Sequence, residues 1–194
     1  MLAPAVLNPK ARTTKMPRPG PVPRSYWLID RKLLAGEYPG TYAETDTREK
    51  LAKFLDAGIR TFIDLTEERE QTRYDDVLRA LSAERGVETT HIRASIRDHC
   101  VPASREQMAS ILATIRDEVA AERPVYVHCW GGIGRTGTVI GCWLVEQGLS
   151  GDEALRRLEE LRRHTPDGLF RSPEVDEQCD YVREWRETKA SGGT

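Results

Sequence analysis

The sequence contains no long apolar run and almost no surplus charge. None of its apolar stretches approaches the roughly 18 residues of a membrane-spanning helix, so we expect no membrane span. The formal net charge is -2. This gives no general attraction to nucleic acid or anionic lipid, so we expect no nucleic-acid partner. Any anion that this protein handles must therefore be bound by a local site.

Cysteine is scarce and lacks the spacing of a disulfide framework. No C-x-x-C pair occurs among Cys100, Cys129, Cys142 and Cys179. A chain of 194 residues can bury a core without crosslinks, so we expect reduced thiols and a cytoplasmic location. Zinc bound by the adjacent pairs His99–Cys100 and His128–Cys129 is disfavoured, because neighbouring side chains rarely chelate one tetrahedral ion. We expect no metal and no cofactor.

Acidic residues are absent from the first 24 positions. Residues 1–24 hold six of the eleven prolines and five basic residues, a composition typical of disordered segments. Regular apolar patterning begins at Ser25 and continues to about residue 188. We therefore predict a disordered leader over 1–24, one domain over 25–188 and a flexible tail over 189–194.

Apolar periodicity predicts strands that alternate with helices. The expected strands cover residues 26–35, 59–65, 87–93 and 125–127. The expected helices start near Asp46, Tyr74, Ser104, Thr136, Ser150 and Ser172. Alternation of this kind indicates βαβ units, so we predict a single α/β domain with a mostly parallel central sheet flanked by helices on both faces.

The segment from His128 to Gly137 lies between a predicted strand and a predicted helix, where parallel α/β sheets bind ligands. Its glycines let successive amide N–H groups converge on one point, and the next helix adds its positive end. Arg135 offers a planar fork for two phosphate oxygens. The segment therefore predicts a phosphate cradle formed by Trp130, Gly131, Gly132, Ile133, Gly134 and Arg135.

Cys129 stands at the mouth of this cradle. The groups that bind a phosphate also favour an ionised sulfur, so Cys129 is the candidate nucleophile. Thr136 is expected to donate its hydroxyl to that sulfur. His128 is interpreted as a structural hydrogen-bonding residue beneath the loop.

Cleavage of a phosphate monoester also needs a proton donor for the leaving oxygen. Asp98 follows the strand that ends near Arg93 and precedes the helix that starts at Ser104, so it should overhang the same edge of the sheet. We assign Asp98 as general acid and then general base. Asp64, after the preceding strand, is the rival acid.

The segment HCWGGIGRTG resembles the His-Cys-x5-Arg-Thr/Ser signature of the protein tyrosine phosphatase superfamily, and is most similar to that of the small dual-specificity-like phosphatases. The resemblance includes the 33–39 segment, the Asp98 loop with Pro102, and Ser172-Pro173-Glu174. It implies a phosphatase domain over 25–188 that hydrolyses phosphate monoesters through a phosphocysteine intermediate. It also implies that Gln178 helps to hold the hydrolytic water.

The implied substrate is phosphotyrosine in proteins, with phosphoserine and phosphothreonine left open. A second reading is a small or non-protein ester, such as a lipid, a nucleotide, an RNA 5′ end or a sugar phosphate. The loop lacks the lysines that phosphoinositide-directed relatives carry, which disfavours a polyphosphorylated lipid. A third reading is a silent phosphate-binding module, against which the intact Cys129, Arg135 and Asp98 argue.

Two further features of the sequence are a cysteine near Asp98 and a basic cluster. Cys100 lies in the acid loop and is a candidate for a protective disulfide with Cys129 under oxidation, although a packed free thiol is the commoner fate. A basic cluster interleaved with Glu159 and Glu160 is predicted to be a solvated helix face, and consists of Arg156, Arg157, Arg162 and Arg163.

Overall fold

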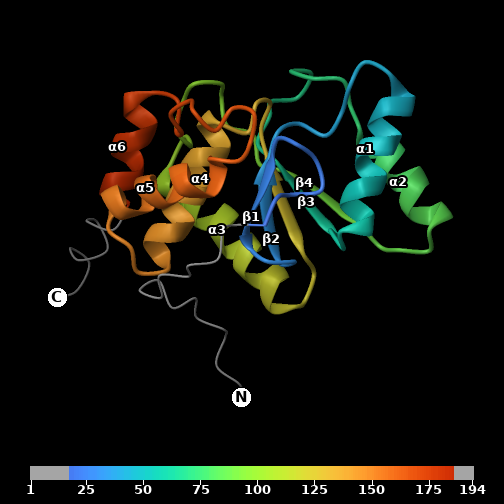
Figure 1. Cartoon of the computed structure of the whole chain (residues 1–194), viewed down its shortest axis with the longest axis horizontal. Coiled ribbons are helices and arrows are strands. Elements are labelled where there is room, and N and C mark those ends of the chain that lie inside the picture. Colours follow the sequence, from blue (N-terminus) through green and yellow to red (C-terminus); the bar gives the residue numbers. More distant parts are fainter. Residues whose placement is uncertain (1–17, 186–194) are drawn as a thin grey trace.

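The computed structural model describes residues 18–185, which form a five-stranded sheet covered by helices on both faces (Figure 1). The predictions for residues 1–17 and 186–194 lie outside the described residues. The strand order is β1-β2-β5-β3-β4. The strands are β1 (Ser25–Ile29), β2 (Leu33–Gly36), β3 (Thr61–Asp64), β4 (Thr90–Arg93) and β5 (Val125–His128).

Only the β1–β2 pair of this sheet is antiparallel; β2, β5, β3 and β4 are mutually parallel neighbours. The prediction of a mostly parallel sheet is therefore confirmed. Strand β4 is shorter than the predicted 87–93 segment. β5 lies at the centre, paired on both sides, and its four residues are all buried.

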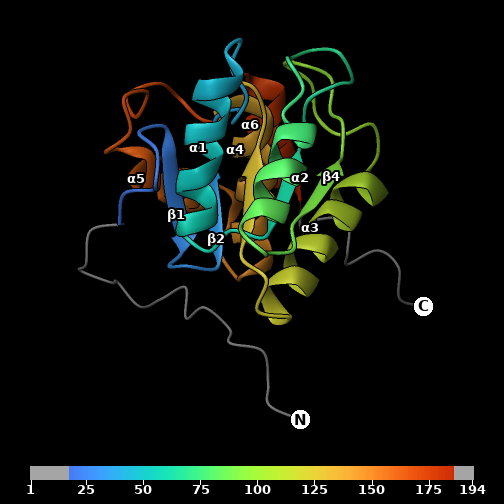
Figure 2. The same cartoon turned by 90° about the vertical axis from the view of Figure 1, so that its right-hand side faces the viewer.

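The helices divide into two groups (Figures 1 and 2). One face of the sheet carries α1 (Glu44–Asp56) and α2 (Asp75–Glu84). The other carries α3 (Arg105–Ala120), α4 (Gly134–Glu146), α5 (Gly151–Arg162) and α6 (Asp176–Glu184). Alternating strand side chains build both cores, since successive residues of a strand point to opposite faces. In β5, Tyr126 belongs to the smaller core over α1 and α2, whereas Val125 and Val127 belong to the larger one.

Helix α4 is the most deeply buried helix and starts two residues before the predicted Thr136. Its glycines allow this placement. A side chain on Gly137 would lie 2.3 Å from the Ser172 hydroxyl, and one on Gly141 would lie 2.7 Å from Val182. Close packing against α6 and the segment before it therefore fixes where α4 lies and begins.

The predicted start of the last helix at Ser172 is wrong. The Ser172 hydroxyl does not cap a helix but donates to the carbonyl of Ile133, 2.7 Å away, and α6 begins at Asp176. The capping box of Ser150 and Glu153 is confirmed.

Two further expectations about helix starts are corrected. Helix α1 begins at Glu44 rather than Asp46 and has no side-chain cap. The Ser104 hydroxyl accepts a hydrogen bond from the backbone amide of Gln107. The side-chain Oε1 of Gln107, however, accepts from the Ala103 amide and not from the Ser104 amide, so only half of the predicted capping box forms.

The sequence indicated a disordered leader over residues 1–24, but residues 18–24 are ordered. Pro19 forms a β-bridge with Tyr26, Val22 is buried, and the amide of Gly20 donates to the carbonyl of Ser25. These residues extend the hairpin edge of the sheet, where the Val22 side chain finds a buried position.

The expectation that Arg162 lies on a solvated helix face is also wrong. Arg162 is 2% exposed, and its guanidinium donates to the carbonyls of Phe170 (2.9 Å) and Asp167 (3.1 Å). It supports the connection between α5 and α6.

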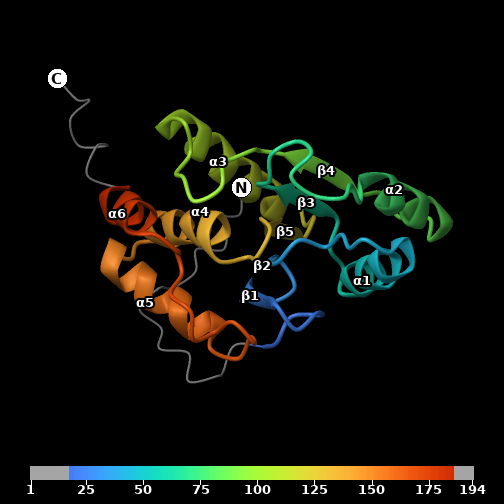
Figure 3. The ribbon, with the colours of Figure 1, turned by 90° about the horizontal axis from the view of Figure 1, so that it is seen from above.

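The four parallel strands deliver four loops to one edge of the sheet, onto which Figure 3 looks. Gly36, His128, Asp64 and Arg93 stand side by side as the last residues of their strands. The loops that follow contain Tyr38, Cys129, Glu70 and Asp98 respectively. No helix among the described residues is long and apolar enough to cross a membrane.

Candidate active site

The loop from Cys129 to Ile133 leaves the central strand and enters α4, as the sequence predicted. It is fixed on two sides. The amide of Tyr38 donates to the Trp130 carbonyl (2.8 Å), and Ser172 holds the Ile133 carbonyl. Cys129 is 3% exposed, so its side chain is almost entirely buried.

Gly132 is the position in this loop that admits no side chain. Its φ of +71° belongs to the left-handed region, and a Cβ there would lie 2.3 Å from the backbone of Gly36. Gly131 differs, because the nearest atoms to its Cβ would be those of Ile133 at 3.8 Å. The loop thus packs against the end of β2 at Gly132, whereas Gly131 has room for a side chain.

We predict that Gly132→Ala destabilises the protein by roughly 2 kcal/mol, because the backbone must move and strain is added at positive φ. The loop should also bind inorganic phosphate more weakly. Gly131→Ala is the matched control and should change the unfolding free energy by less than about 0.5 kcal/mol. Urea unfolding and phosphate calorimetry on both variants measure this. Equal effects of the two would contradict the proposed packing at Gly132.

Arg135, in the first turn of α4, is held by groups from two other loops. Its Nη1 donates to Glu70 Oε2 (2.7 Å) and to the Ile96 carbonyl (3.1 Å). Its Nη2 lies 2.6 Å from Glu70 Oε1 and 3.0 Å from Asp98 Oδ1. Its buried Nε finds no partner among the described residues. One edge of the guanidinium is therefore fixed by protein, and Nε is left for a ligand.

The charge of Arg135 is secure in this setting. Burial opposes the charged form, but the Glu70 hydrogen bonds and the nearby Cys129 and Asp98 raise the pKa of the guanidinium above its usual value. Burial would raise the pKa of Glu70, but the hydrogen bonds from Arg135 and from the Glu67 amide, together with the Arg135 charge, lower it. The pair is ionised at neutral pH.

Glu70 is a site residue that the sequence reasoning missed. It lies in the loop after β3, and the parallel topology places that loop at the same edge as the phosphate cradle. This position was the available signal. The loop also carries Glu67 and Glu68, and composition does not distinguish which carboxylate reaches an arginine 65 residues away.

We predict that Glu70→Ala lowers the unfolding free energy by about 3 kcal/mol, because it leaves a buried guanidinium without its bidentate partner. Inorganic phosphate should restore part of this loss by supplying another anion. Glu68→Ala, an exposed carboxylate of the same loop, should stay within about 0.5 kcal/mol of the parent. Thermal unfolding of both variants, with and without inorganic phosphate, measures these changes in stability. A Glu70 variant as stable as the Glu68 variant would contradict this account.

Asp98 lies where the sequence predicted, in the loop between β4 and α3, and its side chain is 46% exposed. Its neighbour His99 has a φ of +57° and lies 3.6 Å from Glu174 Oε2. The backbone of Cys100 accepts a hydrogen bond from Gln178 Nε2 (3.0 Å). The acid loop is therefore tied to α6 and to the segment before it.

Two predicted site residues, Thr136 and Gln178, have surroundings that differ from the expected ones, whereas Cys100 has the commoner of its two expected fates. The Thr136 hydroxyl is buried and makes no hydrogen bond to any described residue, so the expected bond to the Cys129 sulfur is not formed. Gln178 is buried, and its oxygen accepts from the amides of Glu174 and Val175. Cys100 is a half-buried free thiol.

No group of three or more His, Cys, Asp or Glu side chains within residues 18–185 is arranged to hold a metal ion.

Beneath the loop lies a buried polar network centred on His128. Tyr74 Oη is 2.7 Å from His128 Nε2. Burial raises the pKa of Tyr74 well above its usual value, so the phenol stays protonated and its O–H donates a hydrogen bond to Nε2. Asp64 Oδ1 is 3.9 Å from His128 Nδ1. His128 therefore supports the start of the loop from below, as predicted.

Asp64, the rival acid, is fully buried in this network. Its Oδ1 accepts from the amide and hydroxyl of Thr66, and its Oδ2 lies 3.3 Å from His91 and 3.2 Å from Arg93. Burial alone would raise its pKa, but these hydrogen bonds and the nearby His128 lower it to about 2. A carboxylate that stays ionised has no proton to give at neutral pH.

We predict that the fold loses stability between pH 6.5 and 5. Burial lowers the pKa of His128 to about 4, from an ordinary 6.5. Within this window the unfolded chain binds a proton that the folded protein excludes, so acidification favours unfolding, by about 2 kcal/mol at pH 5. The Asp64 contribution, present above its unfolded value near 4, is lost only at lower pH.

Urea titrations at pH 7.5 and pH 5 measure the effect. His128→Gln should be less stable at pH 7.5 but lose less on acidification, whereas the exposed His99→Gln should behave like the parent protein. An unchanged unfolding free energy of the parent between the two values would contradict the prediction.

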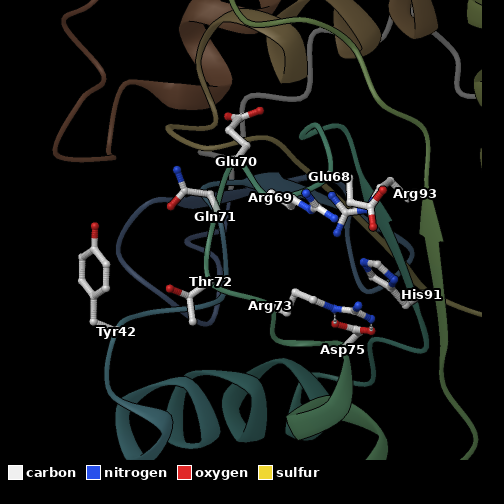
Figure 4. Close-up of a pocket in the computed structure, with 10 residues that line it drawn as sticks. All are labelled: Tyr42, Glu68, Arg69, Glu70, Gln71, Thr72, Arg73, Asp75, His91 and Arg93. Carbon is white, nitrogen blue, oxygen red and sulfur yellow. Dashed lines mark hydrogen bonds and ion pairs between the residues drawn. The ribbon is translucent and has the colours of Figure 1, made fainter.

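A cavity of about 920 Å³ lies beside the site, on the far side of Glu70 (Figure 4). Tyr42 stands on one wall, with Arg69, His91 and Arg93 opposite. Arg73 is paired with Asp75 at its floor. Its three arginines are matched by three carboxylates, Glu68, Glu70 and Asp75. This balance gives the cavity no general attraction for a second phosphate.

A comparison with protein families matches the central part of the chain to one family. The family model described as "Polymorphic toxin system, DSP-PTPase phosphatase" matches residues 35–149, which is more than half of the 194 residues. The matched span contains Cys129, Arg135, Glu70 and Asp98.

Individual relatives agree with this match. "Putative tyrosine phosphatase 067L" of Invertebrate iridescent virus 3 is 29% identical over 125 residues, which are 62% of this chain and 45% of that protein. The chain thus spans about half the length of this curated relative.

Solved structures share the fold. A mutant form of Tk-PTP is 29% identical, with a TM-score of 0.64 and coverage of 87% of this chain and 97% of that one. A variant of TpbA from P. aeruginosa, in complex with pTyr, is 19% identical with a TM-score of 0.61 and coverage of 93% and 99%. At that identity the likeness to TpbA concerns the fold alone.

Proposed function

This chain belongs to the DSP-PTPase phosphatase family of polymorphic toxin systems, and from that premise we propose that it hydrolyses phosphate monoesters through a phosphocysteine intermediate on Cys129. The observation that carries the proposal is the 3.0 Å contact between Arg135 Nη2 and Asp98 Oδ1. This contact joins the loop of the proposed acid to the first turn of α4, which directly follows the loop that holds Cys129. The proposed proton donor thus comes from a part of the sequence separate from the segment that carries the proposed nucleophile and anion binder.

The substrate phosphoryl group takes the place that Arg135 and the loop amides leave for an anion. It receives the free Nε–H, and it replaces Asp98 as the partner of Nη2. Glu70 keeps hold of the other side of the guanidinium, so the fork stays oriented. Once released from Arg135, the Asp98 carboxylate takes a proton from solvent and faces the ester oxygen as a carboxylic acid.

In the first step the Cys129 thiolate attacks phosphorus with an electron pair, and the bond from phosphorus to the ester oxygen breaks. The leaving oxygen takes the proton of Asp98. In the second step the Asp98 carboxylate takes a proton from water as the water oxygen attacks phosphorus. The S–P bond breaks, its electrons return to sulfur, and inorganic phosphate leaves.

Two residues are proposed to assist. The Thr136 hydroxyl, buried without a partner among the described residues, donates to the sulfur as charge returns to it. Gln178 is assigned to the hydrolytic water through the amide N–H that is not bound to Cys100. Both roles apply to the second step, breakdown of the intermediate.

We propose phosphotyrosine in proteins as the main substrate and the cytoplasm as the compartment. Trp130 lies in the loop from Cys129 to Ile133, which we call the phosphate loop. It is 60% exposed and offers an indole to a phosphorylated aromatic ring. The four cysteines are free thiols, as an active thiolate requires.

The test is a substrate panel in the presence of EDTA. It should contain a phosphotyrosine peptide, phosphoserine and phosphothreonine peptides, a phosphoinositide, a nucleotide, an RNA 5′ phosphate and a sugar phosphate. We expect metal-independent turnover, inhibition by vanadate, and the highest kcat/KM for the phosphotyrosine peptide. Acid quenching during turnover of a ³²P-labelled ester should trap label on Cys129. Phosphate binding without hydrolysis of any ester would contradict the proposal.

A further inference from the structure

Exposed apolar side chains gather on segments beside the phosphate loop. Among residues 18–185 the exposed large apolar side chains are Tyr42, Trp130, Leu169 and Phe170. Trp130 belongs to the phosphate loop itself. Leu169 and Phe170, 96% and 64% exposed, are adjacent residues of the connection between α5 and α6. Exposed apolar groups that lie next to a binding site are typical of interaction surfaces.

The connection between α5 and α6 is attached to the phosphate loop at one end. Ser172, two residues after Phe170, donates its hydroxyl to the Ile133 carbonyl. Two residues of chain span at most about 7 Å, so the Phe170 backbone lies within that distance of the Ser172 backbone.

The other end of the connection is attached to the segment that contacts Trp130. Asp167 pairs with Arg24 at 3.0 Å, and Arg24 lies 3.6 Å from Glu37. The next residue, Tyr38, donates its amide to the Trp130 carbonyl. Leu169 and Phe170 therefore sit between two anchors, both of which lead to the phosphate loop.

Buried Arg162 holds the backbone that presents these two side chains. Its guanidinium donates to the carbonyls of Asp167 and Phe170, on either side of Leu169. Burial of a charged group is unfavourable unless its hydrogen bonds are made, so this segment is strongly confined. Gly168 fits closely as well, since a Cβ there would lie 2.4 Å from the Arg162 carbonyl. The exposure of Leu169 and Phe170 is thus a property of a rigid loop.

We propose that Leu169 and Phe170, with Trp130, form an apolar docking surface for the phosphorylated polypeptide, and that it binds an apolar side chain two to four residues from the phosphorylated residue. This inference rests on the proposed function. An extended peptide advances about 3.3 Å per residue, so such a side chain lies roughly 7–13 Å from the phosphorylated one. Because Phe170 lies at most two residues of chain from Ser172, whose hydroxyl contacts the Ile133 carbonyl, Phe170 is within such a distance of the loop.

The charges nearby favour a polypeptide over a membrane. Arg24 is paired with Glu37 and Asp167, and Arg171 with Asp176. Membrane-binding surfaces combine apolar side chains with unpaired cations that attract anionic lipid. Here Arg24 and Arg171 are already paired with carboxylates, so neither is a free cation for an anionic lipid.

The experiment compares phosphotyrosine peptides that differ at one position. Each carries leucine, phenylalanine or serine at one of the positions two to four residues before or after the phosphotyrosine. We expect the parent protein to prefer the best apolar peptide over its serine counterpart by about tenfold in kcat/KM. The double variant Leu169→Ser, Phe170→Ser should reduce this preference to less than about twofold. Its turnover of a small aryl phosphate should equal that of the parent.

Tyr42→Ser is the matched control, since Tyr42 is an exposed aromatic residue on another loop, and it should keep the full preference. A parent protein that hydrolyses aryl phosphate but shows no preference at any position would overturn the docking surface and leave the proposed function standing. Absence of aryl phosphate turnover would instead overturn the proposed function. Binding of the parent to anionic vesicles that the double variant abolishes would assign the surface to lipid and overturn the polypeptide proposal.

Discussion

Cys129→Ser should lower kcat on a small aryl phosphate by about 10⁴-fold or more. A serine hydroxyl at this position keeps its proton at neutral pH and is a poor nucleophile. Arg135 is held by Glu70 and Asp98, neither of which depends on the sulfur. The variant should therefore still bind inorganic phosphate, within a few-fold of the parent protein. Steady-state kinetics and calorimetry on one preparation separate the two effects.

Cys100→Ser serves as the matched control for this substitution. Cys100 is a half-buried free thiol in the acid loop, and the contact of its residue with Gln178 is made by its backbone carbonyl. Its replacement should change kcat by less than about threefold. Appreciable turnover by the Cys129 variant, or a comparable loss in the Cys100 variant, would remove Cys129 from the role of nucleophile.

Asp98→Asn should lower kcat by about 10²- to 10⁴-fold on a substrate with a poor leaving group, such as phosphotyrosine. The amide keeps the shape of the side chain but has no acidic proton for the ester oxygen. The loss should shrink on a nitrophenyl ester, whose leaving group needs no protonation. KM should change little, because Arg135 and the loop amides bind the phosphoryl group. The diagnostic measurement is the dependence of kcat on leaving-group acidity.

Asp64→Asn tests the rival assignment. Asp64 is buried and ionised within a network with His91, Arg93 and Thr66, so its replacement should mainly reduce stability. Any loss of kcat should be the same for good and poor leaving groups. A steep leaving-group dependence in the Asp64 variant, together with full activity of the Asp98 variant on phosphotyrosine, would exchange the two roles.

The sequence by itself determined the parts of this protein that depend on neighbours along the chain. Apolar periodicity predicts the alternating strands and helices, and Ser150 with Glu153 marks a helix start because both partners lie within one turn. The phosphate loop is equally local, since Cys129, its glycines and Arg135 lie within seven consecutive residues. Even the loop that carries Asp98 could be placed, because parallel strands end at one edge of the sheet.

Only the tertiary structure decided the contacts that join distant segments. Glu70 reaches Arg135 across 65 residues, and Arg162 is buried although the nearby Glu160 and Arg163 are exposed. Ser172 holds the phosphate loop instead of capping α6. In each case the partner is a carbonyl, carboxylate or guanidinium that many residues could supply equally well. Sequence pattern limits which side chains reach an edge of the sheet, but packing and the need to satisfy buried polar groups choose among them.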